Sequence, residues 1–250
     1  MVFLKKPTFI VFAFALICSE SFAQEAQSDS TFLKNALAQT VSNFNTSMGE
    51  QARLYNGHEY LPYDRAIQGN ALYPPAASSL EPGEVNYEGF LYKKVPMMYD
   101  IYKDEVVVLL YNKFSMFSLL SERVHDFTLL GHHFVRIDAD TINDDKSGIG
   151  TGFYDQLYGG NNIEVLARRI KTIQNSSNAA IKLETYFVEK NEYYVRKGKT
   201  YYKVGGKGSF LNVLKDKKAQ LQRYIKDQQI DYRANPELAM AQLAAYYDQH

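Results

Sequence analysis

The sequence predicts an α+β protein in which a largely antiparallel β-meander is flanked by one N-terminal helix and two C-terminal helices. Three observations support this fold class. Apolar residues recur at helical spacing near both ends, residues 85–204 contain short runs with strand periodicity, and turn residues separate most of these runs. We therefore predict a single α+β domain over residues 24–250.

The first 23 residues have the three parts of a cleavable signal peptide. Lys5 and Lys6 precede an apolar run that ends at Cys18, and the small residues Ser21 and Ala23 suit a signal peptidase. The run is shorter than the roughly 20 apolar residues that a membrane-spanning helix needs. We expect cleavage after Ala23 and export to the periplasm or outer membrane of a Gram-negative bacterium. Because Cys18 is the only cysteine, the mature chain would lack disulfides and thiolate sites.

Two segments precede the predicted sheet. Residues 28–48 are expected to form a helix that packs on a sheet, with Ser28 or Ser30 as its cap and Gly49 at its end. Its apolar side consists of Phe32, Leu33, Ala36, Leu37, Val41 and Phe44. Residues 55–83 contain four prolines among repeated glycine, asparagine and tyrosine, which predicts an irregular but ordered wrap over the surface.

The segment 85–204 is predicted to be mainly β. Residues 85–138 suggest five or six strands, and the continuous apolar run 106–111 indicates a strand buried on both faces. Residues 163–173 fit either a strand or a short helix. The run 182–204 reads as three strands, with turns at Lys190-Asn191 and Lys197-Gly198.

Residues 209–248 are predicted to be helical. Ser209 is a plausible N-cap for the first helix, and Lys217 interrupts its apolar stripe. Lys217 therefore either extends its ammonium to solvent or marks a point where the helix leaves the sheet. Asn235 followed by Pro236 has the preferred order for an N-cap and first helical residue of a second helix.

The stretch VRKGKTYYKVGGKGSFLNVL, residues 195–214, contains two fragments that resemble a nucleotide-binding P-loop. Such a loop needs a glycine five residues before its Gly-Lys pair, and tyrosines at positions 193 and 201 occupy those places. We interpret Gly205, Gly206 and Gly208 as a strand-to-helix reversal. Anion binding by backbone N–H groups at the helix start is the alternative.

The acidic loop 138–148 suggests an irregular calcium site formed by Asp138, Asp140, Asn143 and Asp145. The EF-hand spacing fails, so a solvated turn is the preferred interpretation. His132 and His133 are adjacent in a predicted strand and are expected to point to opposite faces. Neither a zinc-protease motif nor a serine-hydrolase motif occurs, which favours a protein without enzymatic activity.

A tyrosine-rich, locally basic surface is the candidate contact site. The chain has 20 tyrosines and a formal net charge of zero, which gives no electrostatic reason to expect nucleic acid. The basic residues alternate with glutamates, so a solvated sheet face with cross-strand ion pairs is favoured over a polyanion- or sugar-binding face. The predicted contact residues are Tyr55, Tyr60, Tyr63, Tyr73, Tyr193, Tyr201, Arg168 and Arg169.

The runs NYEGFLYKKVPMMYDIYKDEVVV, GFYDQLYGG, KAQLQRYIKDQQI and LAAYYD give the chain a resemblance to a group of exported Bacteroidota proteins without an assigned activity. This resemblance implies an envelope location, and it brings no catalytic residues and no cofactor. The favoured function is a non-enzymatic binding or accessory protein whose partner is another envelope protein, a glycan or a peptide. The alternatives are a secreted hydrolase acting on glycan or peptide and, more weakly, an outer-membrane β-barrel.

Overall fold

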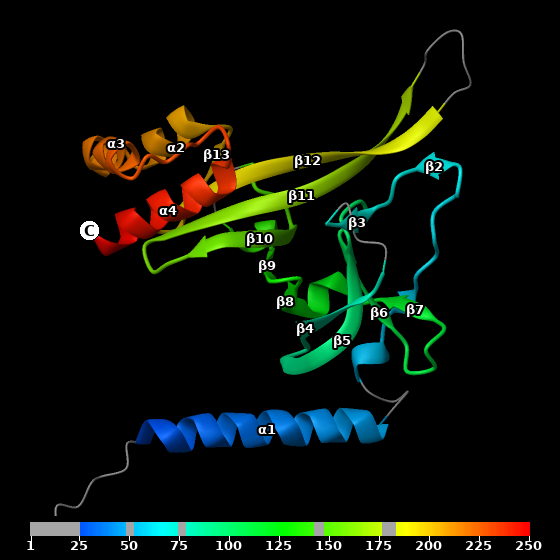
Figure 1. Cartoon of the computed structure of the whole chain (residues 1–250). Coiled ribbons are helices and arrows are strands. Elements are labelled where there is room, and N and C mark those ends of the chain that lie inside the picture. Colours follow the sequence, from blue (N-terminus) through cyan, green and yellow to red (C-terminus); the bar gives the residue numbers. More distant parts are fainter. Residues whose placement is uncertain (1–25, 49–52, 75–78, 143–147, 177–183) are drawn as a thin grey trace, which may run out of the picture. The chain divides into compact units, whose positions relative to one another are not determined.

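The computed structural model describes residues 26–48, 53–74, 79–142, 148–176 and 184–250 (Figure 1). The predicted signal peptide, residues 1–23, lies outside these ranges. The chain divides into one unit of residues 1–39 and one of residues 40–250. None of the described helices has a stretch long and apolar enough to cross a bilayer.

The predicted N-terminal helix is present as α1 (Ala26–Met48). Four of its large apolar side chains, those of Phe32, Leu33, Leu37 and Phe44, are exposed. Packing of this helix on a sheet stays a prediction.

A large, almost entirely antiparallel sheet has the predicted meander order. Its main strands are β4 (Glu81–Tyr87), β5 (Phe90–Asp100), β6 (Glu105–Leu109), β7 (Met116–Ser118), β8 (Val124–Leu129), β9 (His132–Ile137), β10 (Gly152–Gly159), β11 (Ile163–Ser176), β12 (Glu184–Lys197) and β13 (Thr200–Val204). Consecutive strands β4 to β7 run towards one side of the sheet. The chain then returns to place β8 beside β4, and β8 to β13 run towards the other side. The two hairpin series therefore meet at the β4–β8 pair.

Residues 55–74 of the predicted wrap have little regular structure, residues 75–78 lie outside the described residues, and residues 81–83 belong to β4. The wrap begins with the 3-10 turn η2 (Arg53–Tyr55) and contributes the two-residue strands β1 (His58–Glu59), β2 (Ile67–Gln68) and β3 (Leu72–Tyr73). These strands pair with β7, β12 and β5, respectively. The buried Lys171 ammonium on β11 donates to the backbone oxygens of Asn70 at 2.9 Å and Leu72 at 2.8 Å. The wrap is thus fastened to distant strands of the sheet.

The buried apolar residues of the described ranges form four clusters, of which two are much larger than the others. In the first, the rings of Phe127 and Phe134 stack with centroids 4.7 Å apart, and Tyr99 meets both edge-on. Such ring pairs contribute about 0.5–1.5 kcal/mol each beyond their buried area. Residues 106–108 of β6 are all buried, as predicted for a strand covered on both faces, but the rest of the run 106–111 is not: Leu109 and Leu110 are half-buried and Tyr111 is 46% exposed. The second core lies between β10–β13 and the C-terminal helices.

The C-terminal helices are α2 (Lys207–Val213), α3 (Lys218–Asp227) and α4 (Pro236–Gln249), so a 3-10 turn, η5 (Lys215–Lys217), divides the first predicted helix. Ser209 is not the N-cap. Its hydroxyl lies inside the first turn and accepts hydrogen bonds from the N–H groups of Gly205 at 3.0 Å and Gly206 at 3.1 Å. The Asn235 cap is confirmed, since its side chain accepts from Leu238 N–H at 3.0 Å.

The predicted turn at Lys190-Asn191 is wrong. β12 is one continuous strand of 14 residues and pairs with β11 along its whole length, from Ile163 opposite Lys197 to Ser176 opposite Glu184. The polar residues at positions 189–192 reflect their place on a strand whose two faces are both partly solvated. The open choice for residues 163–173 is also resolved, because they lie within β11.

Candidate ligand-binding pocket

A polar pocket of about 290 Å³ lies where the β5–β6 turn approaches β11 and β12. Its side chains come from three parts of the chain that are far apart in sequence. Its polar lining residues are Tyr102, Asp104, Arg168, Arg169, Glu192 and Tyr194. The pocket thus combines the Arg168 guanidinium with two carboxyl groups and two phenol rings, while the Arg169 side chain is 4% exposed.

Arg168 on β11 is the cation of the pocket. Its Nη1 donates to the Tyr154 hydroxyl at 3.0 Å, and its Nη2 lies 3.5 Å from Asp104 Oδ2. Burial alone would lower the pKa of Arg168, but Tyr154 and Asp104 outweigh it and raise this pKa. A guanidinium has five N–H donors, and these two contacts leave donors available for a ligand. The side chain is 22% exposed, so it is held in place and still reachable.

Asp104, in the β5–β6 turn, fixes the position of this guanidinium. It accepts hydrogen bonds from the Tyr99 hydroxyl at 2.6 Å and from Phe153 N–H at 3.3 Å. Burial raises the pKa of Asp104, and the bond from Tyr99 and the charge of Arg168 counteract part of that increase. The carboxyl group therefore belongs to a network that spans β5, β10 and β11.

Two glycines allow the Asp104 and Arg168 side chains to approach the backbone at the start of β10 closely. A Cβ on Gly152 would lie 2.2 Å from Asp104 Oδ2 and 2.7 Å from Arg168 Nη2. Gly152 also has a φ of +150°, which side-chain-bearing residues rarely adopt. A Cβ on Gly150 would lie 3.1 Å from Arg168 Nη1. The Gly-rich sequence before β10 thus leaves room for the ion pair.

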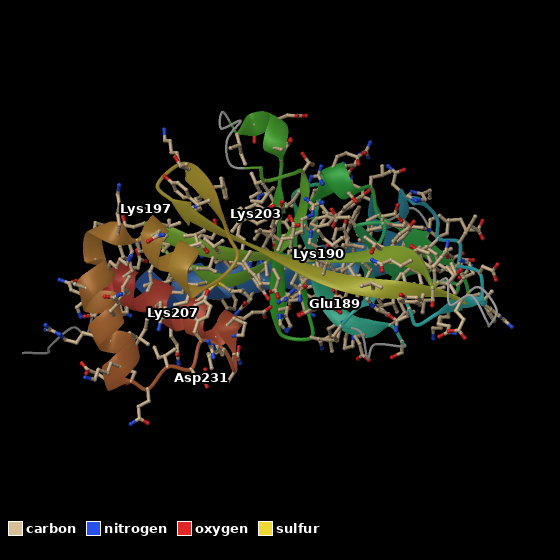
Figure 2. All side chains as sticks on the ribbon, turned by 90° about the horizontal axis from the view of Figure 1, so that it is seen from above. Glu189, Lys190, Lys197, Lys203, Lys207 and Asp231 are labelled. Atoms are coloured by element: carbon tan, nitrogen blue, oxygen red, sulfur yellow. The ribbon has the colours of Figure 1, made fainter. Side chains whose placement is uncertain are left out.

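Glu192 is a fixed anion at the other side of the pocket. Its carboxylate accepts from Lys190 Nζ at 2.5 Å, from Lys203 Nζ at 2.8 Å and from the Tyr194 hydroxyl at 3.1 Å. Lys190 on β12 and Lys203 on β13 lie on neighbouring strands (Figure 2). The hydrogen bonds from these two lysines lower the pKa of Glu192 to about 2.

Arg169 belongs to a separate ionic cluster, formed by Asp155, Arg169, Glu237 and His132. Successive residues of a strand point to opposite faces, so Arg168 and Arg169 have different surroundings. The Arg169 guanidinium is 4% exposed, bonds to the Asp155 carboxylate and donates to Glu237 Oε1 at 2.5 Å. His132 Nδ1 lies 2.9 Å from Asp155 Oδ2, and this hydrogen bond raises the pKa of His132. The interpretation of Arg169 as part of a solvated face is therefore wrong.

Most of the predicted contact tyrosines also hold the fold together. Tyr60 and Tyr63 donate to Asp100 Oδ2 at 2.9 and 2.7 Å, and Asp100 is fully buried. Tyr73 is buried beside His132, with its hydroxyl 3.2 Å from Nε2. Tyr193 donates to Glu237 at 2.8 Å.

The two remaining tyrosines of the predicted set are half-buried. Tyr55 contacts Tyr111, with ring centroids 6.4 Å apart. Tyr201, on β13, lies opposite Arg196 of β12. Burial thus contradicts a surface role for Tyr60, Tyr73 and Arg169. Arg168 and Arg169 of the predicted contact set both line the pocket, and Arg168 is the more accessible of the two, with a side chain 22% exposed against 4% for Arg169.

The predicted calcium loop is described only in part. Asp138 and Asp140 are exposed, and the Asp138 carboxylate accepts from Asp140 N–H at 3.2 Å in the 3-10 turn η4 (Ala139–Thr141). Asn143 and Asp145 lie outside the described residues. Within the described ranges, no group of three His, Cys, Asp or Glu side chains is placed to hold a metal ion. His132 and His133 have different partners, Asp155 and Gln156, as expected for opposite faces.

Sequence reasoning missed Asp104, Tyr102, Glu192 and Tyr154. The available signal was the glycine spacing in GIGTG, residues 148–152, which indicates close approach of the backbone to another group.

No protein-family model matches the chain, and no curated protein or solved structure is significantly similar to it. The geometry of the pocket therefore carries the functional argument by itself.

Proposed function

We propose that this protein is a non-enzymatic binding or accessory protein of the bacterial envelope, and that its pocket binds a carboxylate group of a glycan or peptide. The observation that carries the proposal is the Arg168 guanidinium, which Asp104 and Tyr154 orient while N–H donors remain available. The envelope location rests on the signal-like segment 1–23.

The chemistry of Arg168 favours a carboxylate. A guanidinium presents pairs of parallel N–H donors, and a carboxylate accepts such a pair through both oxygens. Because Lys190 and Lys203 neutralise Glu192, that carboxylate does not cancel the charge of Arg168. The Tyr102 ring, 42% exposed, offers an apolar surface with a polar tip beside the guanidinium.

The proposal is tested by calorimetric titration with glucuronate and with triglycine, which carry a carboxylate on a sugar and on a peptide. Arg168→Gln should abolish binding of whichever probe the wild type binds. Arg196→Gln is the matched control, because Arg196 lies on β12 and bonds to Glu164 at 2.8 Å, outside the pocket lining. Equal binding by wild type and Arg168→Gln would contradict the proposal.

A hydrolase is the second candidate, and one observation favours it. Two carboxyl groups line the same pocket with pKa values shifted in opposite directions, raised for Asp104 and lowered to about 2 for Glu192. A carboxyl group with a raised pKa beside one with a lowered pKa is the arrangement used in glycoside hydrolysis. Under this alternative the wild type would hydrolyse a chromogenic glucuronide, and Asp104→Asn would not. Absence of turnover together with binding of glucuronate would leave only the binding function.

A further inference from the structure

One end of the sheet exposes large apolar side chains on two neighbouring hairpin turns. At the β4–β5 turn, Phe90 is 38% and Leu91 42% exposed. At the β6–β7 turn, Tyr111 is 46% and Phe114 90% exposed. A single exposed apolar residue is ordinary on a protein surface, but four on adjacent turns are not.

The topology brings these two turns to the same end. β4, β5, β6 and β7 are consecutive antiparallel neighbours, so the β5–β6 turn lies at the opposite end from the other two (Figure 1). The 3-10 turn η2 contacts both the β4–β5 turn and the β6–β7 turn. The Arg53 guanidinium lies 5.2 Å from the centroid of the Phe90 ring, and Tyr55 contacts Tyr111. We call Arg53, Phe90, Leu91, Tyr111, Lys113 and Phe114 the tip surface.

Phe114 is held in its exposed position by a defined turn. The Asn112 side chain accepts from Phe114 N–H at 2.9 Å and from Ser115 N–H at 3.0 Å. Lys113 N–H donates to the Leu110 carbonyl at 2.9 Å, and Lys113 has a φ of +61°. Asparagine side chains stabilise turns through such bonds. The backbone therefore presents the aromatic ring to solvent and does not merely leave it uncovered.

The charges of the tip surface are positive. Arg53 and Lys113 are both exposed, and neither forms an ion pair among the described residues. The neighbouring acid, Glu88, is already paired with Arg123 at 2.5 Å. Two cations therefore accompany the exposed rings, and no acid among the described residues forms an ion pair with either of them.

We propose that the tip surface docks on a membrane surface that contains anionic phospholipid. Phenylalanine, leucine and tyrosine side chains insert at the boundary of headgroups and acyl chains, and nearby Lys and Arg side chains are attracted to an anionic leaflet. The exposed side chains lie on hairpin turns, and a fluid bilayer accommodates them without the fitted pocket that an aromatic anchor needs on a protein partner.

This docking leaves the pocket accessible. The pocket is lined by the β5–β6 turn, which lies at the far end of β5 from the tip surface. A strand rises about 3.3 Å per residue, so the 11 residues of β5 place Phe90 roughly 30 Å from the β5–β6 turn, and the 5 residues of β6 place the β6–β7 turn roughly 15 Å from it. A membrane-docked molecule would hold its pocket away from the lipid. The docking proposal does not depend on what the pocket binds.

Co-sedimentation with vesicles tests the proposal. The chain from residue 24 onward is mixed with phosphatidylcholine vesicles and with vesicles of phosphatidylcholine and phosphatidylglycerol in equal parts. The wild type should bind the anionic vesicles, and added salt should weaken that binding. Phe114→Ser should weaken it by roughly tenfold, because one inserted aromatic side chain is lost. Since Phe114 is almost fully exposed, this change should leave the fold intact, as circular dichroism would verify.

Leu130→Ser is the matched control. Leu130 is 47% exposed at the β8–β9 turn. This turn lies at the opposite end of the sheet from the tip surface, because Thr128 pairs with Glu84 near the start of β4, whereas the β4–β5 turn follows the end of β4. The control variant should bind like the wild type. The proposal is overturned if the wild type ignores anionic vesicles, or if Phe114→Ser and Leu130→Ser bind equally. It is also overturned if only substitution of the exposed Phe32 and Leu37 of α1 abolishes binding.

Discussion

Replacing Asp155 with asparagine tests the ionic cluster on the buried side of β11. Asp155 is 2% exposed, bonds to the Arg169 guanidinium and lies 2.9 Å from His132 Nδ1. The amide keeps the shape of the carboxylate but removes its charge. Arg169 is then left with Glu237 as its remaining carboxylate partner among the described residues.

The magnitude follows from burial. Removing one member of a buried ion pair costs about 3–5 kcal/mol, because the other charge stays buried without its partner. Glu237 compensates part of the charge of Arg169, so we expect a loss of about 3 kcal/mol in the free energy of unfolding. With a urea dependence of about 1–3 kcal/mol per molar, the unfolding midpoint should fall by about 1 M or more.

The assay is urea unfolding of wild type, Asp155→Asn and a matched control, Asp126→Asn. Asp126 on β8 also contacts histidines, but it is 25% exposed. Its substitution should cost under about 1 kcal/mol, as for partly solvated pairs. A loss below about 1 kcal/mol for Asp155→Asn would refute the reasoning that this cluster is a buried structural element.

Four further predictions concern single residues. Gly152→Ala should destabilise the protein by about 2 kcal/mol in urea unfolding, since its Cβ would collide with Asp104 and its φ of +150° is unfavourable. Lys171→Met should cost about 2 kcal/mol and make residues 55–83 more sensitive to limited proteolysis, because it removes the bonds to the wrap. Asn235→Ala should cost about 1 kcal/mol through loss of the α4 cap. The lowered pKa of Glu192, about 2, gives stability that is present above its ordinary pKa of 4.5 and lost as pH falls towards 2. Unfolding of Glu192→Gln should therefore lack that part of the acid dependence.

Local patterns predicted much of the fold because they act over a few residues. The apolar run of β6, the proline-rich wrap and the Asn235-Pro236 helix start depend on burial, backbone restriction and capping that adjacent residues determine. The error at Lys190-Asn191 has the same origin. A polar pair usually marks a turn, but here pairing along the full length of β11 keeps the strand extended.

The sites could not be predicted in this way because they assemble across the sheet. The pocket combines the β5–β6 turn with strands that follow more than 60 residues later, as the separation of Asp104 and Arg168 illustrates. Arg168 and Arg169 are equivalent in a sequence pattern, and both line the pocket, yet the alternation of a strand leaves the Arg168 side chain 22% exposed and buries the Arg169 guanidinium in an ionic cluster. Which tyrosines are exposed likewise depends on where the wrap meets the sheet.

The most direct measurement for the central claim is an NMR titration that follows the arginine Nε–H signals of the mature chain while glucuronate and triglycine are added in turn. Binding through the pocket predicts that the Arg168 signal moves in a saturable manner with one of these probes. The neighbouring Arg169 signal should stay in place, because Asp155 and Glu237 already occupy its guanidinium. A stationary Arg168 signal with both probes, or equal movement of both arginines, would contradict the assignment of the pocket as a carboxylate-binding site.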